Sequence, residues 1–66
     1  MEKGKVKWYD AVKGFGFIEP ESGKDLFVHR TGLSCNANEM QENALVEYEV
    51  KDGEKGLYAE NVKVVG

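Results

Sequence analysis

Phe15 and Phe17 are separated only by Gly16 in the stretch KGFGFIEP, which spans residues 13–20. Side chains two positions apart project from the same face of a β-strand, so both rings would lie on one side of a sheet. Inside a core, the rings would be ordinary packing. On a surface beside lysines, they would be flat platforms on which unpaired bases can stack, with cations placed for the phosphates. The chemistry of this stretch therefore depends on which way the rings point.

The two-residue period separates aliphatic from aromatic side chains over residues 15–19 and 25–29. The aliphatic set consists of Ile18, Leu26 and Val28. The opposite set consists of Phe15, Phe17, Glu19, Asp25, Phe27 and His29. Charged side chains are almost never fully buried unless they are paired, so only the aliphatic set can form a core. We therefore expect the three phenylalanines to face solvent, with His29 and Asp25 beside them.

Trp8 can join these rings only if the first strand is irregular. Val6 and Trp8 have the same parity, so a regular strand that buries Val6 would bury Trp8 as well. A bulge near Lys7, of the kind that barrel strands often contain, would turn Trp8 to the aromatic side. Lys7 and Lys13 would then flank the rings as candidate phosphate contacts.

The charge of the chain limits how such a surface can bind. The net charge is -3, and residues 1–30 hold six basic against five acidic side chains, whereas residues 31–66 hold three against seven. Binding that depends on neutralising phosphates needs many positive charges. We therefore expect stacking to supply most of the affinity, and we expect single strands to bind better than duplexes, whose base faces are already occupied.

Other kinds of chemistry have little support in the sequence. Cys35 is the single cysteine and His29 the single histidine, so neither a disulfide within the chain nor a zinc shell can form. No helix follows Gly14 and Gly16 to make a phosphate cradle, and no serine or threonine has a recognisable catalytic partner. We expect a binding protein and not an enzyme, with no metal or other cofactor. Because no membrane span or signal peptide is visible, we expect a cytoplasmic protein. We also expect a monomer.

The elements that must position these residues are short strands. Segments rich in β-branched and aromatic residues, bounded by turn residues, predict strands over 5–10, 15–19, 25–29, 45–51 and 57–65. The stretch NANEMQENAL at 36–45 is the one helix candidate, and we interpret it mainly as a long loop. With 66 residues, the chain is long enough for one domain, residues 1–66, with a thin core.

The last two strands complete the predicted core. Alternation assigns Val46, Tyr48 and Val50 inward in the fourth strand. In the fifth strand the alternating sets are Ala59 with Asn61, or Glu60 with Val62 and Val64, and we assign Val62 and Val64 inward. Closing five short antiparallel strands into a barrel removes the exposed edges. The sequence therefore predicts an all-β fold, a small five-stranded antiparallel barrel, with an open meander or SH3-like barrel as the alternative.

Three stretches also resemble the cold-shock protein family, in the same order and spacing along essentially the whole chain. They are GKVKWYD at 4–10, KGFGFIEP at 13–20 and DLFVHRTGL at 25–33. The resemblance implies an OB-type barrel that binds single-stranded RNA and DNA with little sequence preference, in RNA-chaperone, translational or antitermination roles during cold adaptation. The positions that match the family's binding set are Lys7, Trp8, Lys13, Phe15, Phe17, Asp25, Phe27 and His29.

Several positions depart from that family's usual pattern. Tyr9 and Asp10 stand where phenylalanine and asparagine are commoner, which puts a carboxylate close to the expected ligand path. Arg30 stands where members of that family usually have an aromatic residue. The loop SCNANEM at 34–40, which often supplies another ring in the family, contains no aromatic residue here. We expect Arg30 to stack its guanidinium plane on a base or to hold a phosphate. We expect Tyr58, in KGLYAENV at 55–62, to supply one stacking ring in place of those that are missing.

A different class of function is also compatible with exposed rings. Contiguous exposed apolar patches mark binding sites of several kinds, so the rings could dock a peptide or a second copy of the chain. The lysines and histidine among the rings favour nucleic acid, because dry protein interfaces are depleted of lysine.

Overall fold

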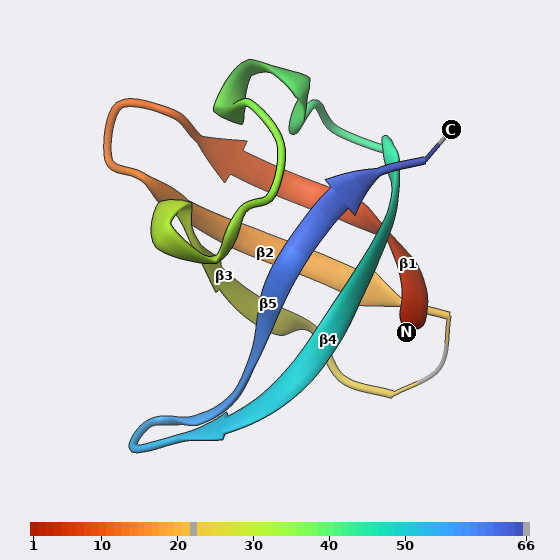
Figure 1. The fold of residues 1–66 in the computed structure, drawn as a ribbon, viewed down its shortest axis with the longest axis vertical. Coiled ribbons are helices and arrows are strands. Elements are labelled where there is room, and N and C mark those ends of the chain that lie inside the picture. The colour runs from red at the N-terminus through yellow and green to blue at the C-terminus, as the bar shows by residue number, and fades with distance from the viewer. Residues whose placement is uncertain (22, 66) are drawn as a thin grey trace.

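Five strands form a closed all-β barrel in the computed structural model, which describes residues 1–21 and 23–65 (Figure 1). The strands are β1 (Glu2–Asp10), β2 (Phe15–Pro20), β3 (Leu26–His29), β4 (Leu45–Gly53) and β5 (Gly56–Val64). Their order around the barrel is β1-β2-β3-β5-β4, and β4 closes on β1. The predicted OB-type barrel is confirmed. The strand pairing differs from the predicted antiparallel barrel at one place: β3 and β5 pair in parallel, whereas the other pairs are antiparallel.

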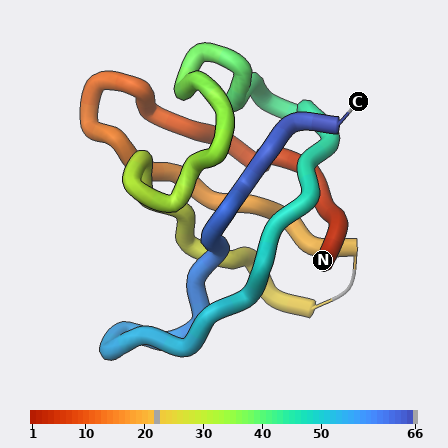
Figure 2. Tube along the Cα trace, viewed as in Figure 1, coloured from red at the N-terminus to blue at the C-terminus, as the bar shows by residue number. Residues whose placement is uncertain are grey.

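The connection from β3 to β4 crosses one end of the barrel, where it is green in Figure 2. It contains two 3₁₀ turns, η1 (Arg30–Gly32) and η2 (Ala37–Glu39). A capping box between Asn36 and Glu39 holds the second turn, and Met40 follows it into the core. The interpretation of 36–45 mainly as a loop is therefore confirmed. Within the two described ranges, no helix is long and apolar enough to cross a membrane.

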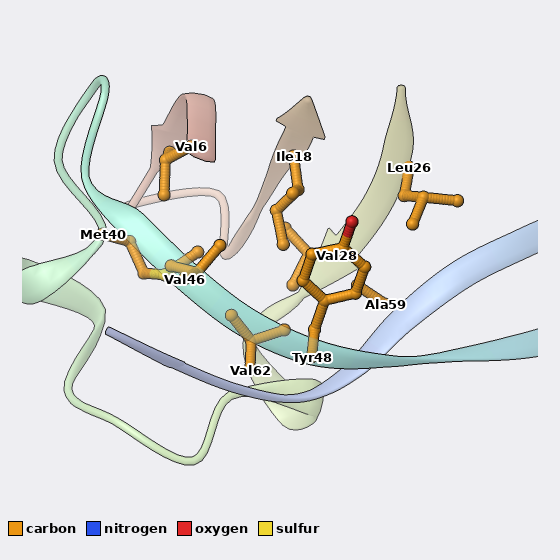
Figure 3. Packing of buried hydrophobic residues seen from close by; sticks show 9 residues of the cluster. All are labelled: Val6, Ile18, Leu26, Val28, Met40, Val46, Tyr48, Ala59 and Val62. Carbon is orange, nitrogen blue, oxygen red and sulfur yellow. The ribbon is translucent and has the colours of Figure 1, made fainter. Parts of the chain in front are cut away.

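The core consists of side chains from all five strands together with Met40, and Figure 3 shows them pointing towards one another. Its members are Val6, Ile18, Leu26, Val28, Met40, Val46, Tyr48, Ala59 and Val62. The inward assignments of Ile18, Leu26 and Val28 are confirmed, and so are those of Val6, Val46, Tyr48 and Val62. Val64 is half-buried against this cluster.

Val50 was expected in the core, and this expectation is wrong, because its side chain is 39% exposed. β1 pairs with β4 only from Leu45 to Tyr48. Beyond Tyr48, β4 has β5 as its strand partner, and the two continue as a hairpin away from the barrel (Figure 1). Alternation predicted the face of Val50 correctly, since Val50 pairs with the buried Ala59, but that face is only partly covered.

Two bulges decide which side chains face outward. In β1 the register shifts between Val6 and Trp8, so that Val6 pairs with Ile18 and Trp8 with Phe17. Lys7 is the extra residue, and the predicted bulge is confirmed. The second shift, between Glu47 and Glu49, was not predicted.

At the second bulge, β5 contains one residue more than β4. Glu47 pairs with Lys63, and Glu49 pairs with Glu60. Between these two pairs, β4 has the single residue Tyr48, whereas β5 has two residues, Asn61 and Val62. Asn61 has a positive φ of 55°, in the left-handed region. The parity of β5 therefore inverts at Asn61. Residues Val62 and Ala59 are both buried, and Glu60, which shares the parity of Val62, lies on the outer side.

Candidate nucleic-acid interface

Four aromatic rings from three adjacent strands cluster on the outer surface of the barrel. Trp8 is 39% exposed and Phe27 38%, and Phe15 and Phe17 are partly exposed. The prediction that the phenylalanines face outward is confirmed, since the aliphatic residues between them are buried. We use the term aromatic face for the rings together with the histidine and tyrosine that continue their row. It comprises Trp8, Phe15, Phe17, Phe27, His29 and Tyr58.

Strand register places the rings side by side. Trp8 pairs with Phe17, Phe17 with Phe27, and Phe15 with His29. The centroid of the Trp8 ring lies 5.6 Å from that of Phe15 and 5.5 Å from that of Phe17. Phe27 lies 6.1 Å from Phe15 and 5.9 Å from Phe17. The rings thus form one continuous apolar surface, of the kind that marks a binding site.

Gly16 separates Phe15 from Phe17 because its position has no room for a side chain. A Cβ atom there would lie 2.3 Å from the carbonyl oxygen of Trp8 and 2.9 Å from the ring of Tyr9. The glycine therefore lets β1 approach β2 closely where Trp8 turns outward. This close approach is a physical reason for the alternation of ring, glycine and ring.

Lys7 and Asp25 form an ion pair beside the rings, with 2.6 Å between Nζ and Oδ2. The hydrogen bond to Asp25, and then the charge of Asp25, raise the pKa of the Lys7 ammonium group. Sequence analysis proposed Lys7 as a phosphate contact and Asp25 as a base acceptor. The structure brings the two together, so a ligand that engages either one must share it with the other.

Asp10 is engaged by the backbone of the turn between β1 and β2. Its Oδ1 accepts hydrogen bonds from the amides of Val12 and Lys13, each at 3.0 Å, and its carbonyl accepts one from Gly14 at 2.7 Å. The carboxylate that sequence analysis placed near the ligand path is therefore a turn cap. This turn ends directly before Phe15, and Lys13 within it is exposed.

His29 extends the row of rings. Its ring centroid lies 6.5 Å from that of Phe27, with 31° between the planes. The amide of Thr31 donates to His29 Nδ1 at 3.3 Å, and the hydroxyl of Thr31 lies 3.0 Å from the same atom. Since a backbone amide can only donate, Nδ1 is an acceptor, and a neutral ring carries its proton on Nε2.

Arg30 lies beside the turn between β1 and β2. Its amide donates to the carbonyl of Gly14 at 2.8 Å, and its side chain lies against the position of Gly14, 2.9 Å from where a Cβ would be. Its charge acts on the Tyr9 hydroxyl, whose pKa is raised by burial and partly lowered again by Arg30. A ligand contact by Arg30 stays a prediction.

Tyr58 is brought to the aromatic face by the parallel pairing of β5 with β3, in which it lies opposite Phe27. Two hollows flank it. One of about 620 Å³ is lined by Phe17, Phe27 and residues 53–58 of the hairpin. The other is lined by His29, Thr31, Gly32, Tyr58, Ala59 and Glu60.

Sequence analysis missed Leu57 and Glu60 at these hollows. Leu57 is 57% exposed beside the larger hollow, and Glu60 borders the smaller one. The position of Leu57, an apolar residue between Gly56 and Tyr58 in a hairpin, could have indicated that it lies at the surface. The signal for an outward Glu60 was the following residue, Asn61, because asparagine tolerates the positive φ that a bulge can require. Among the described residues, no group of three or more His, Cys, Asp or Glu side chains could hold a metal ion.

Comparisons with known proteins agree with this geometry. The family model described as "'Cold-shock' DNA-binding domain" matches residues 2–65. The major cold shock protein of Micrococcus luteus is 52% identical over 64 residues, which cover 94% of this chain and 96% of that protein. The major cold shock protein CspA of Pseudomonas aeruginosa is 49% identical over 65 residues, covering 97% and 94%. The cold shock-like protein of Thermotoga maritima is 44% identical over 64 residues, covering 96% and 97%. The chain belongs to the cold-shock domain family.

Proposed function

We propose that the protein binds single-stranded RNA and DNA by stacking unpaired bases on the aromatic face, and that it acts as a binding module without catalysis or a cofactor. The observation that carries the proposal is the separation of side chains in β2 and β3, where phenylalanines lie outside and aliphatic residues form the core. A contiguous exposed apolar patch of this kind usually marks a binding site.

Stacking supplies the larger part of the expected affinity. Each base stacked on an aromatic side chain contributes about 1–3 kcal/mol, so three stacked bases contribute roughly 3–9 kcal/mol before ordering costs. Lys7 is shared with Asp25, whereas Lys13 and Lys55, which lines the larger hollow, have no ion pair within the described ranges. The affinity should therefore depend weakly on salt, with a slope of roughly -2 or shallower.

In the cell, such a module would keep RNA single-stranded. A strand whose bases are stacked on protein cannot pair, so the protein would favour open RNA over hairpins, as an RNA chaperone or antiterminator does. The described relatives carry cold shock in their names. We propose that this chain serves the same response, as a cytoplasmic monomer.

A fluorescence titration tests the proposal directly, because Trp8 is the single tryptophan and lies among the rings. Octamers of uridine or thymidine should quench it, and a duplex of the same length should quench it much less. Phe17→Ala should reduce the affinity for both octamers. A protein that does not respond to any single strand would refute the proposal.

The competing function is docking of a protein through the same rings. It predicts no quenching by oligonucleotides and a dimer whose population rises with concentration in sedimentation experiments. The lysine and histidine side chains around the rings argue against it, since protein interfaces are depleted of lysine.

A further inference from the structure

Glu60 extends the aromatic face beyond Tyr58. In the parallel pairing of β3 with β5, Phe27 lies opposite Tyr58 and Val28 opposite Ala59. Val28 and Ala59 are buried, so the residues on either side of Ala59 share the outward face of Phe27 and His29. The bulge at Asn61 then returns β5 to the core. A half-buried carboxylate is thus held on the surface where bases are proposed to stack.

The smaller hollow, bordered by His29, Tyr58 and Glu60, offers fixed hydrogen-bonding groups. The Tyr58 hydroxyl donates to Glu60 Oε2 at 3.3 Å, which orients the carboxylate. Across the hollow, the backbone amide of Thr31 in η1 donates to Nδ1 of His29 on β3, so Nε2 is the donor of the neutral ring. The hollow therefore presents two acceptor oxygens and one donor nitrogen.

Two other carboxylates in the neighbourhood are already engaged. Glu49, which pairs with Glu60 across the β4–β5 ladder, lies 3.9 Å from the ammonium group of Lys51 and accepts a hydrogen bond from the Asn61 side chain. Asp25 is paired with Lys7. Glu60 is the carboxylate that borders the smaller hollow, and within the described residues its hydrogen-bond partner is a neutral hydroxyl, which leaves it able to accept from a ligand.

This pattern fits one base better than the others. The Watson–Crick edge of guanine carries two adjacent N–H donors, N1–H and the N2 amine, next to the acceptor O6. A carboxylate can accept both donors while a neighbouring N–H donates to O6. Uracil and thymine have one N–H between two carbonyl groups, and those carbonyl oxygens would be repelled by the carboxylate. Adenine and cytosine have an amine next to an acceptor nitrogen. Single strands leave these edges free for recognition.

We propose that the hollow is a guanine-selective subsite and that Glu60 is its specificity-determining residue. The proposal rests on the function proposed above, because it requires a single strand on the aromatic face. It adds a base preference at one end of that face, where Glu60 and His29 select the base and the rings bind its neighbours without regard to sequence.

Fluorescence anisotropy of labelled octamers tests the proposal. Octauridine is compared with octamers in which one guanosine replaces each uridine in turn. The best-placed guanosine should bind at least about fivefold more tightly than octauridine, the lower end expected for a bidentate contact. Inosine lacks the N2 amine and should recover only part of this gain.

Variants then assign the preference to the carboxylate. Glu60→Gln should abolish the preference for guanosine, so that the best-placed guanosine octamer and octauridine bind with similar affinities. Glu42→Gln removes the same charge from an exposed loop position and should retain the preference. Tyr58→Phe keeps the ring, removes the hydroxyl that orients Glu60, and should weaken the preference. It gives a second test if Glu60→Gln lowers the melting temperature.

The outcomes separate this proposal from the one on which it rests. Equal affinities for octauridine and every guanosine octamer would overturn the subsite and leave single-strand binding intact. A guanosine preference that persists in Glu60→Gln and Tyr58→Phe would overturn the assignment to Glu60. Failure of the wild-type protein to bind any octamer would overturn both proposals.

Discussion

Phe27 and Ile18 lie on neighbouring strands, but the side chain of Ile18 belongs to the core and that of Phe27 to the aromatic face. Ile18 is fully buried in the core, whereas Phe27 is 38% exposed beside the rings of Phe15, Phe17 and His29. Removing a buried side chain costs the transfer free energy and leaves a cavity, and removing an exposed ring costs little. Function and stability therefore depend on different residues of the same two strands, and they can be measured separately.

Phe27→Ala should weaken binding of octauridine by about 1–3 kcal/mol, the contribution of one stacked base, with little change in the free energy of unfolding. Ile18→Ala is the matched control and should lower the free energy of unfolding by about 2–5 kcal/mol. Fluorescence titration and urea unfolding measure the two quantities. A large loss of stability in Phe27→Ala would show that the ring belongs to the core.

Lys13 is the residue for which an electrostatic contribution can be isolated. Lys13→Gln should make the slope of log K against log salt shallower by about 0.7, the value for one phosphate contact on a single strand. Lys63, which is paired with Glu47 on the β4–β5 ladder, provides a control of equal charge, and Lys63→Gln should leave the slope unchanged. An identical slope in wild type and Lys13→Gln would remove Lys13 from the interface.

At the scale of elements, the two bulges determine the composition of the binding face. The bulge at Lys7 turns Trp8 towards Phe17, and the bulge at Asn61 turns Tyr58 and Glu60 outward while Val62 stays in the core. Without these irregularities, strict alternation would bury Trp8 together with Val6, and Glu60 together with Val62. Bulges that redirect side chains beside functional sites are a common device in barrels.

Asn61→Gly and Asn61→Ala test the second bulge. Both remove the side-chain hydrogen bond to Glu49, so their difference reports on the backbone alone. Position 61 has a φ of 55°, which glycine adopts freely and alanine does not. The glycine variant should therefore be the more stable of the two by about 1–2 kcal/mol in urea unfolding. Equal stabilities would mean that the positive φ is not needed in solution.

The fold and much of the site could be predicted from the sequence because alternation carries most of the information. The strands, the inward Ile18 and Val28, and the outward Phe15 and Phe17 follow from the two-residue period alone. The first bulge was deduced because a core Val6 and a surface Trp8 require one. The second was missed because both parities of β5 contain apolar residues. The exposure of Val50 could not be predicted, because it depends on where the pairing of β4 with β1 ends. That point is set by how the barrel closes and not by the local sequence pattern.

For the whole molecule, the closed barrel leaves a thin core in which polar atoms need partners. The Tyr48 hydroxyl donates to the carbonyl of Lys3 at 3.3 Å. The Tyr9 hydroxyl is buried without a hydrogen-bond partner among the described residues. An unsatisfied buried polar group costs about 1–3 kcal/mol. Tyr9→Phe removes that hydroxyl and keeps the ring, so we expect it to be neutral or stabilising in urea unfolding at neutral pH.

The same hydroxyls give the barrel a pH dependence with a definite sign. Burial raises the pKa of Tyr9 and Tyr48, and the hydrogen bond to Asp25 raises the pKa of Lys7. All three groups hold their protons more tightly when folded, so above about pH 10, where free tyrosine and lysine titrate, the unfolded chain binds fewer protons. Stability should therefore fall as the pH rises through this window.

Urea unfolding at intervals between pH 8 and pH 11 would measure this decline, and Tyr9→Phe should make it less steep because one titrating group is gone. A stability that stayed constant across the window would contradict the burial of both tyrosines.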